Sequence, residues 1–244
     1  MHPGIEDYYA SPARRPGIAR ALFNRSARHY DLINRIFSLG SGAWYRRYCL
    51  RQAGVGPGMT IVDVAVGTGL LAREARALMQ GQGLLCGVDL SEAMLEIARK
   101  NLGIPLIQAT AEALPIAPGT ADFVTMGYAL RHVANLDLTL REALRVLRPG
   151  GRVVLLEISA PSNRLARLAA GAFVGGILPV LSLLLARDRQ ARALMSYHWR
   201  TIAAYAPPAA VLGAMRGCGF ESPQCASELD LFHCYTGKKP EDQV

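Results

Sequence analysis

The stretch that decides the fold is Thr60-Ile61-Val62-Asp63-Val64-Ala65-Val66-Gly67-Thr68-Gly69. It begins as an apolar run of strand type, turns at two glycines, and is followed by a helical pattern over residues 70–79. A strand, a glycine turn and a helix in this order bring bare backbone close to a ligand at a helix N-terminus. Gly67 and Gly69 carry no Cβ, so the chain can bend sharply and the ligand can approach the peptide.

Two kinds of nucleotide site compete for this stretch. Residues 67–72 fit the dinucleotide pattern G-x-G-x-x-G/A, and Asp89 follows at the usual distance for a ribose-binding acid. Asp63 favours another ligand, because a lone carboxylate inside a strand is costly to bury, whereas at a strand end it would lie beside a cation. An acid four residues before Gly67 is the pattern of S-adenosylmethionine binding, and that ligand carries sulfonium and ammonium charges. The stretch therefore favours a methyltransferase over a dehydrogenase.

The composition suits one soluble α/β domain with a basic surface. The chain has 244 residues, of which 51% are hydrophobic, and a formal net charge of +8 that comes almost wholly from arginine. A basic surface suits an anionic partner such as a membrane or a nucleic acid, although a solvated basic face explains it equally well. The sequence contains no recognition-helix or RNA-binding pattern, so nucleic acid is not favoured as a partner.

Cysteine usage and the N-terminus indicate the compartment. The cysteines are scattered and form no C-x-x-C pair, which argues for a reducing compartment and against a disulfide framework or a zinc site. The N-terminus lacks a charged-then-apolar secretory pattern. We expect a cytoplasmic protein without a metal, with possible peripheral contact at the inner face of the membrane. The cysteines are Cys49, Cys86, Cys218, Cys225 and Cys234.

Strand and helix patterns alternate along most of the chain with short links. This alternation predicts a Rossmann-like α/β fold, a mostly parallel sheet with helices on both faces. Arg148-Pro149-Gly150-Gly151 is expected to make a tight return between a helix and the next strand, because proline cannot continue the helix. The expected strands lie at 59–64, 84–88, 106–109, 122–126, 152–158, 220–226 and 229–236, and the expected helices include 70–79, 91–101, 138–147 and 208–215.

Two further helical segments are expected to cover the open edge of this sheet. Residues 1–17 read as a loose arm, and residues 18–244 as one domain. Within it, residues 18–53 form a helical pattern broken at Gly40-Ser41-Gly42, and helices placed before the first strand can lie over the edge where doubly wound folds bind ligands. Residues 160–206 form the second segment, expected to be an apolar lid.

The centre of that second segment, residues 168–186, carries no charge. Its length could span a bilayer. Gly171, Gly175, Gly176 and Pro179 should break it, however, so we expect a hydrophobic lid or a membrane-dipping helix rather than a span. An apolar lid over the site predicts a lipophilic substrate. The alternative is an ordinary pair of core helices.

With these pieces placed, the chain resembles the ubiquinone/menaquinone-biosynthesis C-methyltransferase family, within the class I S-adenosylmethionine-dependent methyltransferases. The resemblance covers about Ala27 to Lys238. The residues that carry it are Tyr30-Asp31-Leu32-Ile33-Asn34 with Ser38 and Gly40, Asp63-Val-Ala-Val-Gly67-Thr68-Gly69, Asp89, Ala111-Glu112-Ala113-Leu114-Pro115, Leu130-Arg131 and Leu147-Arg-Pro-Gly-Gly151.

The resemblance implies a seven-stranded sheet with the last strand antiparallel, and a defined set of cofactor contacts. Thr68 and its flanking glycines would lie beside the methionine part of S-adenosylmethionine, Asp89 would bind the ribose, and Gly127 would close the site. Thr110 and Ala111 would flank the adenine. The implied cofactor-binding residues are Asp63, Ala65, Gly67, Thr68, Gly69, Asp89, Leu90, Thr110, Ala111 and Gly127.

The chain departs from the family pattern at several positions. Val66 stands where a glycine is usual, which narrows the turn. Thr110 replaces the usual acid or amide that reads the adenine amino group, although a hydroxyl can still bond there. His132 stands where asparagine is common, and Leu231-Phe232-His233-Cys234 replaces a small apolar stretch.

The reaction that the resemblance implies is methyl transfer to a ring carbon of a quinol, which requires no metal. His132 is the preferred general base because its ordinary pKa lies near working pH. Arg131 could bind the developing phenolate, and Tyr30 on the lid could orient a ring oxygen or the cofactor. The plainer alternatives are a histidine bonded within its turn and an arginine in a structural ion pair.

Three other functions remain open. The chain could methylate oxygen or nitrogen of another lipophilic metabolite or lipid, or it could use S-adenosylmethionine for different chemistry. It could also be a non-catalytic, membrane-associated scaffold of a biosynthetic complex. A homodimer is a further expected partner arrangement.

Overall fold

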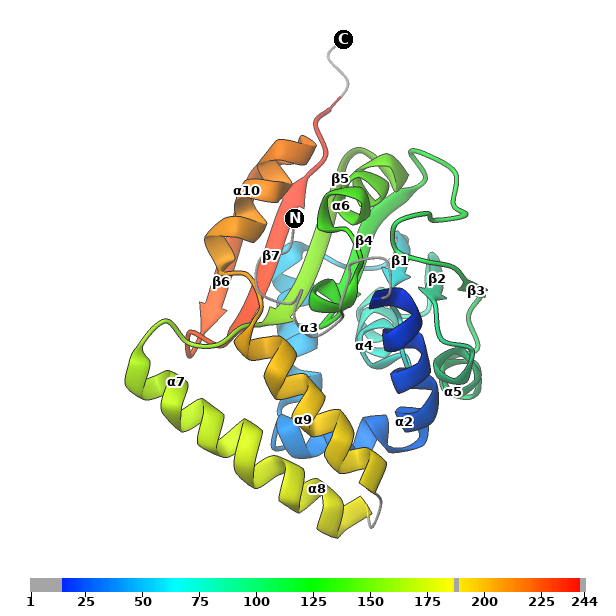
Figure 1. The fold of residues 1–244 in the computed structure, drawn as a ribbon. Helices are drawn as coiled ribbons and strands as arrows, with labels where there is room; N and C mark the ends of the chain where they lie inside the picture. The colour runs from blue at the N-terminus through cyan, green and yellow to red at the C-terminus, as the bar shows by residue number, and fades with distance from the viewer. Residues whose placement is uncertain (1–14, 187–188, 242–244) are drawn as a thin grey trace.

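The computed structural model describes residues 15–186 and 189–241. The expected N-terminal arm therefore falls largely outside the described residues. The strands are β1 (Thr60–Val64), β2 (Leu84–Asp89), β3 (Leu106–Gln108), β4 (Ala121–Gly127), β5 (Leu147–Ile158), β6 (Glu221–Glu228) and β7 (Phe232–Lys238). They form one seven-stranded sheet in the order β3-β2-β1-β4-β5-β7-β6 (Figure 1).

The sheet has the topology that the sequence predicts. Neighbouring strands among β1 to β5 pair in parallel, whereas β7 runs antiparallel to both β5 and β6. Strand β5 contains an apolar run from Val153 to Leu156, and all four of these side chains are buried. Burial on both faces is the pattern of a sheet that is covered on both sides. The seven strands and the antiparallel last strand are confirmed.

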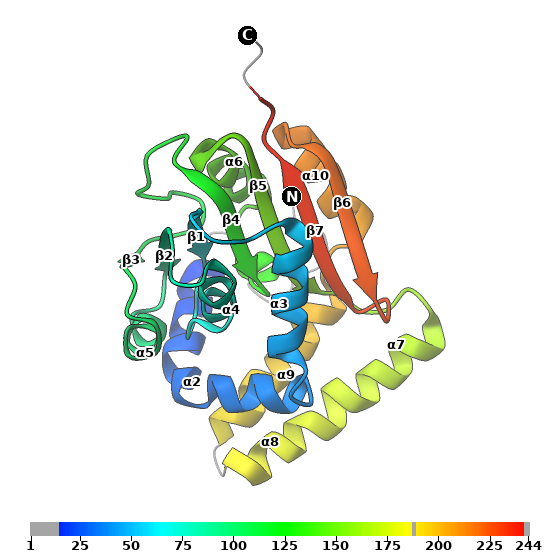
Figure 2. The same cartoon turned by 180° about the vertical axis from the view of Figure 1, so that it is seen from behind.

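Helices cover both faces of the sheet (Figures 1 and 2). One face carries α3 (Gly42–Ala53), α4 (Leu70–Met79) and α5 (Glu92–Leu102), and the other carries α6 (Leu136–Val146) and α10 (Pro208–Cys218). In α4 the buried residues Leu71, Ala72, Ala75 and Met79 fall on one side of the helix, which is the apolar stripe that faces a core.

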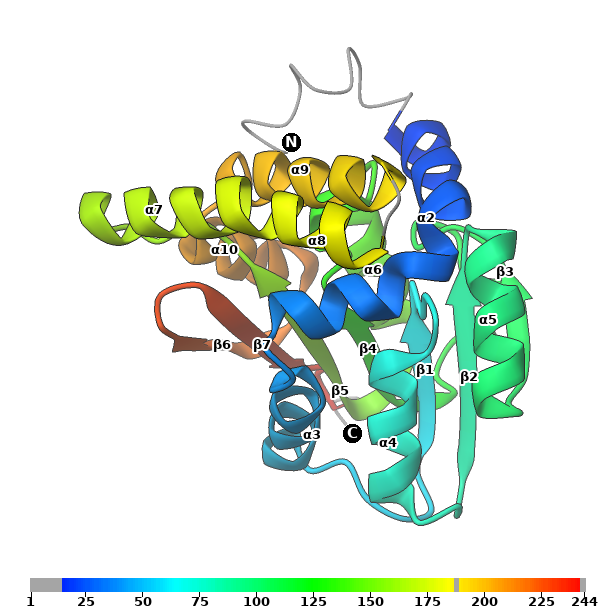
Figure 3. The same cartoon turned by 90° about the horizontal axis from the view of Figure 1, so that it is seen from below.

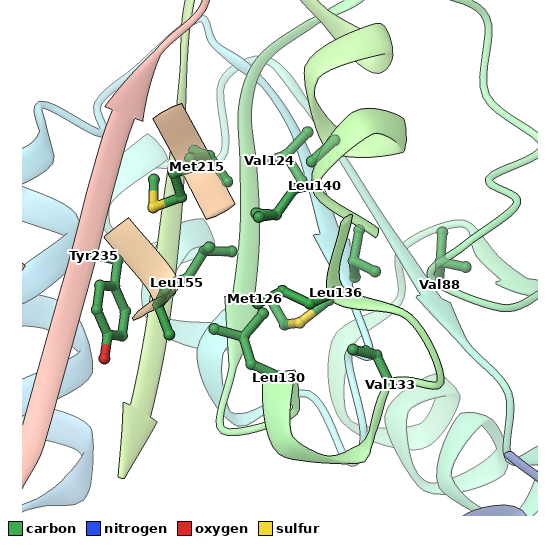
Figure 4. Close-up of a cluster of buried hydrophobic side chains, with 14 of the residues drawn as sticks. Val88, Val124, Met126, Leu130, Val133, Leu136, Leu140, Leu155, Met215 and Tyr235 are labelled. Atoms are coloured by element: carbon green, nitrogen blue, oxygen red, sulfur yellow. The ribbon is translucent and has the colours of Figure 1, made fainter. Parts of the chain in front are cut away.

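Two apolar clusters result from this layering. On the α6 and α10 face, Met126 and Leu155 of neighbouring strands lie among Leu140, Met215 and Tyr235 (Figure 4). Close packing on both faces makes the sheet a rigid platform, so the loops at its carboxyl edge begin from fixed positions.

The remaining helices lie over the carboxyl edge of the sheet (Figure 3). They are α2 (Arg15–Phe37), α7 (Arg164–Ala170), the π-helical segment η3 (Gly171–Ile177), α8 (Leu178–Ala186) and α9 (Arg189–Ala203), and the short 3-10 turn η2 (Leu130–His132) follows β4. Helix α2 packs against α5, α8 and α9. Of the two helices that precede β1, α2 crosses this edge, whereas α3 packs beside α4 on the sheet face.

The expectation that glycines break the apolar segment is wrong. Helices α7 and α8 and the π-helical turn between them form one continuous rod (Figure 1). Gly171 and Gly175 serve packing instead, because a Cβ on Gly175 would lie 2.6 Å from Trp199 of α9, and a Cβ on Gly171 would lie 3.1 Å from the same ring. Tertiary packing thus outweighs the low helix propensity of glycine.

The expectation of a tight turn at residues 148–151 is also wrong. These residues belong to β5, whose pairing with β4 is irregular between Ala121 and Phe123. Gly150 takes a positive φ of 74° and donates its N–H to the carbonyl of Lys239, at 3.1 Å, and Lys239 donates back to Gly151 at 2.8 Å. The end of β7 therefore satisfies backbone groups that a local turn would have paired internally.

Candidate active site

Three adjoining cavities lie along the carboxyl edge of the sheet. The first, called here the edge cavity, spans about 770 Å³, including space open to solvent, between α2 and the ends of β1, β2 and β4. Six of the predicted cofactor residues outside the glycine turn line it, and they come from four separate loops. They are Ala65, Asp89, Leu90, Thr110, Ala111 and Gly127.

Asp89 is held in place at the end of β2 by two backbone amides. Its Oδ2 accepts the N–H of Gly67 at 2.8 Å, and its Oδ1 accepts the N–H of Ser91 at 2.8 Å. Burial raises the pKa of the Asp89 carboxyl, and the amide hydrogen bonds oppose this rise. Each carboxylate oxygen has a second lone pair, so the group can still accept hydrogen bonds from a ligand in the edge cavity.

The glycine turn has the geometry that its sequence requires. Gly67 and Gly69 both take positive φ values, of 57° and 94°. A Cβ on Gly69 would lie 2.5 Å from the side chain of Leu102, so Gly69 allows close packing against α5 and does not line the cavities, whereas Gly67 lines the edge cavity. Non-glycine residues with positive φ also border the site, namely Ala65 at 55° and Tyr128 at 61°. Such strain collects at functional sites.

Asp63 lies deeper than the sequence suggests. It is 1% exposed, its Oδ1 accepts the Thr125 hydroxyl at 2.7 Å, and its Oδ2 has no hydrogen-bond partner among the described residues. Burial raises the pKa of this carboxyl to about 7. Although Asp63 is the last residue but one of β1, it is not among the residues that line the three cavities.

The second cavity, called here the neck cavity, spans about 310 Å³, including space open to solvent, at the glycine turn and the beginning of α4. Thr68 lines it, together with Gly67, Gly127 and Tyr128. The Thr68 hydroxyl donates to Oδ1 of Asp31 at 2.5 Å, which ties α2 directly to the turn. This contact joins two motifs that lie far apart in the sequence.

Helix α2 is fastened over the edge cavity at a second place. Arg20 pairs with Glu92 at the beginning of α5, and the Ser91 hydroxyl donates to Oδ1 of Asn24 at 2.5 Å. The ion pair is exposed and contributes little by itself. Together with the Thr68–Asp31 contact, these bonds place α2 as a closed wall of the site. No local sequence pattern points to Asn24 or Arg20 as site residues.

The third cavity, called here the aromatic cavity, is the largest of the three, at about 1250 Å³ including space open to solvent. Its walls come from α2, α3, α9 and the beginning of β7, and they are mostly aromatic or aliphatic. Tyr30 and Tyr128 line all three cavities, so these two rings stand where the spaces meet. The lining includes Phe37, Trp44, Tyr45, Tyr48, Ile158, Met195, Ile202 and Phe232.

The two predicted catalytic residues of η2 face different cavities. His132 lines the edge cavity, and its Nδ1 lies 2.7 Å from the hydroxyl of Tyr197, whose ring stacks on the imidazole. Arg131 lines the aromatic cavity. The sequence places them side by side but cannot show that a 3-10 turn directs them to opposite sides.

Arg131 is 2% exposed and forms an ion pair with Glu157 of β5. It also donates to the carbonyl of Tyr128 at 2.9 Å and contacts Nδ1 of His198 at 3.0 Å. Burial and the nearby guanidinium lower the pKa of His198 to about 3, so this histidine is neutral at physiological pH. Arg131 therefore forms the structural ion pair that the sequence left as an alternative, and it also lines the aromatic cavity.

Among the described residues no group of three or more histidine, cysteine, aspartate or glutamate side chains could hold a metal ion. The residues at the edge and neck cavities instead match an adenosyl ligand. A fixed carboxylate faces the edge cavity, a glycine turn opens the backbone beside it, and strained residues border the junction.

The family model of the ubiE/COQ5 methyltransferase family matches residues 13–227. The chain belongs to the ubiE/COQ5 methyltransferase family. It is 35% identical over 229 residues to the demethylmenaquinone methyltransferase of Symbiobacterium thermophilum, covering 90% of each chain. It is also 35% identical over 176 residues to the ubiquinone/menaquinone biosynthesis C-methyltransferase UbiE of Hahella chejuensis, covering 69% of this chain and 71% of that one.

Solved structures show the same architecture. A S-adenosylmethionine-dependent methyltransferase of Thermotoga maritima superposes with a TM-score of 0.63 at 23% identity, covering 90% of this chain and 99% of that one. Phosphoethanolamine N-methyltransferase 2 of Haemonchus contortus, solved with S-adenosylmethionine, has a TM-score of 0.57 at 14% identity, covering 81% and 52%. This ubiE/COQ5 family member is thus an S-adenosylmethionine-dependent methyltransferase with the class I fold.

Proposed function

We propose that this enzyme methylates a ring carbon of a lipophilic quinol in quinone biosynthesis. The observation that carries the proposal is the aromatic cavity, which adjoins the cofactor side at Tyr30 and Tyr128. Its volume and its aromatic walls suit a flat ring with an apolar substituent. The relatives are named for ubiquinone and menaquinone biosynthesis or for demethylmenaquinone, which is consistent with such an acceptor.

S-Adenosylmethionine supplies an electrophilic methyl group, and the chain must align the acceptor carbon with it. In the proposed arrangement Asp89 binds the ribose, Thr110 and Ala111 flank the adenine, and Thr68 lies beside the methionine part. Tyr30, on the wall shared by the cavities, orients the acceptor ring toward the methyl group. Alignment of this kind contributes several kcal/mol to the rate, on the order of 7–11 in well-oriented systems.

Formation of the new carbon–carbon bond requires that the acceptor lose a proton. We assign His132 as the base that accepts this proton, and its ring is held by stacking on Tyr197 and by the contact of Nδ1 with the Tyr197 hydroxyl. Arg131 is assigned to the developing phenolate from the wall of the aromatic cavity. Its pairing with Glu157 fixes the guanidinium in direction, which favours a preformed electrostatic partner over a mobile one.

Product identification tests this proposal. The enzyme is incubated with methyl-labelled cofactor and a reduced demethylmenaquinone, and the product is located by mass and carbon connectivity. A labelled ring methyl supports the proposal. A label on oxygen or nitrogen assigns the enzyme to another methyltransferase class, and cofactor binding without S-adenosylhomocysteine formation on any quinol favours a scaffold or a different chemistry.

We further propose that the enzyme is cytoplasmic and contacts the membrane through the rod of α7, η3 and α8. By length and composition this rod, over Arg164–Leu181, could cross a membrane, and only 17% of it is buried. Exposed apolar side chains recur along the rod, and Arg164 and Arg167 near its beginning are also exposed. Apolar contact beside basic residues suits an anionic bilayer surface. The exposed residues are Leu165, Leu168, Phe173, Ile177 and Val180.

Vesicle flotation tests the membrane contact. The wild type is expected to float with vesicles that contain phosphatidylglycerol, and the variant Leu165→Gln/Leu168→Gln/Ile177→Gln to remain in solution. Leu84→Gln is the matched control, because Leu84 is 69% exposed at the opposite edge of the sheet. Equal flotation of the triple variant rejects this surface. Sedimentation without vesicles tests the homodimer, and a dimer lost in the triple variant would assign the face to a second copy.

A further inference from the structure

Arg46 of α3 is a buried cation that has no anionic partner in the described part of the chain. Arg46 is 7% exposed. Its guanidinium donates one long hydrogen bond, 3.4 Å to Oδ1 of Asn34, and lies over the Tyr128 ring at 5.1 Å from the ring centre. No carboxylate of residues 15–186 or 189–241 forms an ion pair with it. Buried charges are normally paired, because removing a charge from water costs on the order of several kcal/mol. Attraction to an opposite charge offsets this cost.

Its neighbours show that this is not a general property of the chain. Arg131, the other arginine that is buried among the residues with described burial, has Glu157 as its partner. The residue next to Arg46 on the helix, Arg47, is half exposed and pairs with Glu74 of α4, with Nε donating to Oε2 at 2.8 Å. Arg46 therefore points into the site while Arg47 points to the neighbouring helix.

The space beside Arg46 is suited to an anion. Arg46 lines both the neck cavity and the aromatic cavity, and among the described residues it is the one charged side chain that lines the neck. The neck also adjoins the N-terminus of α4, where Gly69 offers no side-chain hydrogen bond to the free amides. The positive end of that helix adds to the arginine charge.

A glycine in the sequence leaves room for the guanidinium. A Cβ on Gly42 would lie 2.8 Å from Nη1 of Arg46 and 2.9 Å from the hydroxyl oxygen of Ser38. Gly42 thus lets the side chain fold back along the first turn of α3 toward the neck. Asn34 fixes the other side, since its amide donates to the carbonyl of Tyr30 and its oxygen faces Arg46.

We propose that Arg46 binds the α-carboxylate of the methionine part of S-adenosylmethionine. With the adenosine in the edge cavity, the amino-acid part enters the neck, and its carboxylate is the only anion that the cofactor brings. A planar guanidinium matches a carboxylate through two parallel hydrogen bonds. The inference rests on the cofactor of the family, not on the acceptor proposed above.

Binding calorimetry with two cofactors tests it. S-Adenosylmethionine and decarboxylated S-adenosylmethionine differ in this carboxylate alone, so the ratio of their affinities measures what the protein gains from it. The wild type is expected to prefer the carboxylate form at least tenfold, and Arg46→Met to bring the ratio within about twofold of one. Arg46→Lys should fall between them, because lysine keeps the charge but loses the fork.

Arg47→Met is the matched control and should keep the wild-type ratio. An unchanged ratio in Arg46→Met overturns the proposal, and so does an equal loss of both affinities, which would make Arg46 a support of the fold. If Arg46→Met does not melt cooperatively, Arg46→Gln and Arg46→Lys supply the ratio. A normal ratio with a raised KM for the quinol assigns Arg46 to the acceptor. If the enzyme proves not to methylate a quinol, the expected affinity ratios for the two cofactors stay the same, so the two proposals fail separately.

Discussion

Val66 packs its two methyl groups against Gly87 of β2, where a Cβ built on the glycine would lie 3.0 Å from each. Val66 occupies the position at which the family resemblance has a glycine. Its side chain is 5% exposed and belongs to the apolar cluster on the α4 face. The methyl groups of Val66 fill the space that Gly87 leaves by having no side chain, so valine fits in the turn without displacing β2.

This relationship predicts a compensating pair of mutations. Gly87→Ala should lower the free energy of unfolding by roughly 1–3 kcal/mol, because it overpacks the contact with Val66. Val66→Ala/Gly87→Ala should recover most of that loss in urea unfolding. Gly213→Ala on α10 is the control, since no atom lies within 4 Å of its Cβ position. Failure of the double variant to recover would mean that Leu106, also close to Gly87, carries the clash.

The fold was accessible from sequence because its signals are local and periodic. Helix α4 has the expected bounds, and Ser91 caps α5 by accepting the N–H of Met94. Both features depend on residues that are close together in the sequence. The family resemblance implied the grouping of Asp89 with Thr110 and Gly127, and the sheet topology explains it. Carboxyl ends of parallel strands meet at one edge, so residues there converge whatever their separation in sequence.

What the sequence could not show depends on long-range packing. Gly175 looks like a helix breaker until Trp199 of another helix is placed on it. Glu157 lies inside an apolar strand, and nothing nearby in sequence links it to Arg131. Arg46 is one of many arginines in the first third of the chain, so its burial carries no compositional signal. These roles are set by neighbours that meet only in the folded state.

Replacement of Asp89 tests the ribose contact. Asp89→Ala should weaken binding of S-adenosylmethionine at least tenfold by calorimetry, about 1.4 kcal/mol, because the carboxylate would no longer accept ribose hydroxyls. The amides of Gly67 and Ser91 also lose their acceptor, so melting of the ligand-free variant must accompany the measurement. Glu96→Gln, at an exposed position on α5, is the control. Unchanged affinity would reject the ribose role.

The buried carboxyl of Asp63 predicts a pH dependence of stability. Its pKa is about 7 in the folded protein against an ordinary 3.8, because burial disfavours the charged form. Between these values the unfolded chain binds fewer protons at this site, so the contribution of Asp63 to stability falls as the pH rises. Asp63→Asn should therefore gain about 2–3 kcal/mol relative to the wild type between pH 5 and pH 8. Parallel stability curves would contradict the assignment.

The ion pair of Arg131 and Glu157 predicts a large and non-additive loss. Glu157→Gln leaves a buried guanidinium without its anion and should cost roughly 3–5 kcal/mol of unfolding free energy. Arg131→Met/Glu157→Gln should cost less than the two single changes together, because no uncompensated charge remains. Glu241→Gln, which removes an exposed pair with Lys238, should change stability by less than about 0.5 kcal/mol. Additive losses would show that the two groups act separately.

His132 offers the sharpest choice between chemistry and structure, since it faces the edge cavity and not the aromatic one. As the general base, His132→Ala should lower kcat by about 10²–10⁴ while cofactor affinity stays constant, and it should remove one limb of the pH–rate profile. Tyr197→Phe changes the partner of Nδ1 and should shift that limb without abolishing turnover. His29→Ala, on α2 and outside the three cavities, should keep the wild-type profile. A His132→Ala enzyme that melts earlier but retains the full profile would place the proton transfer on another group.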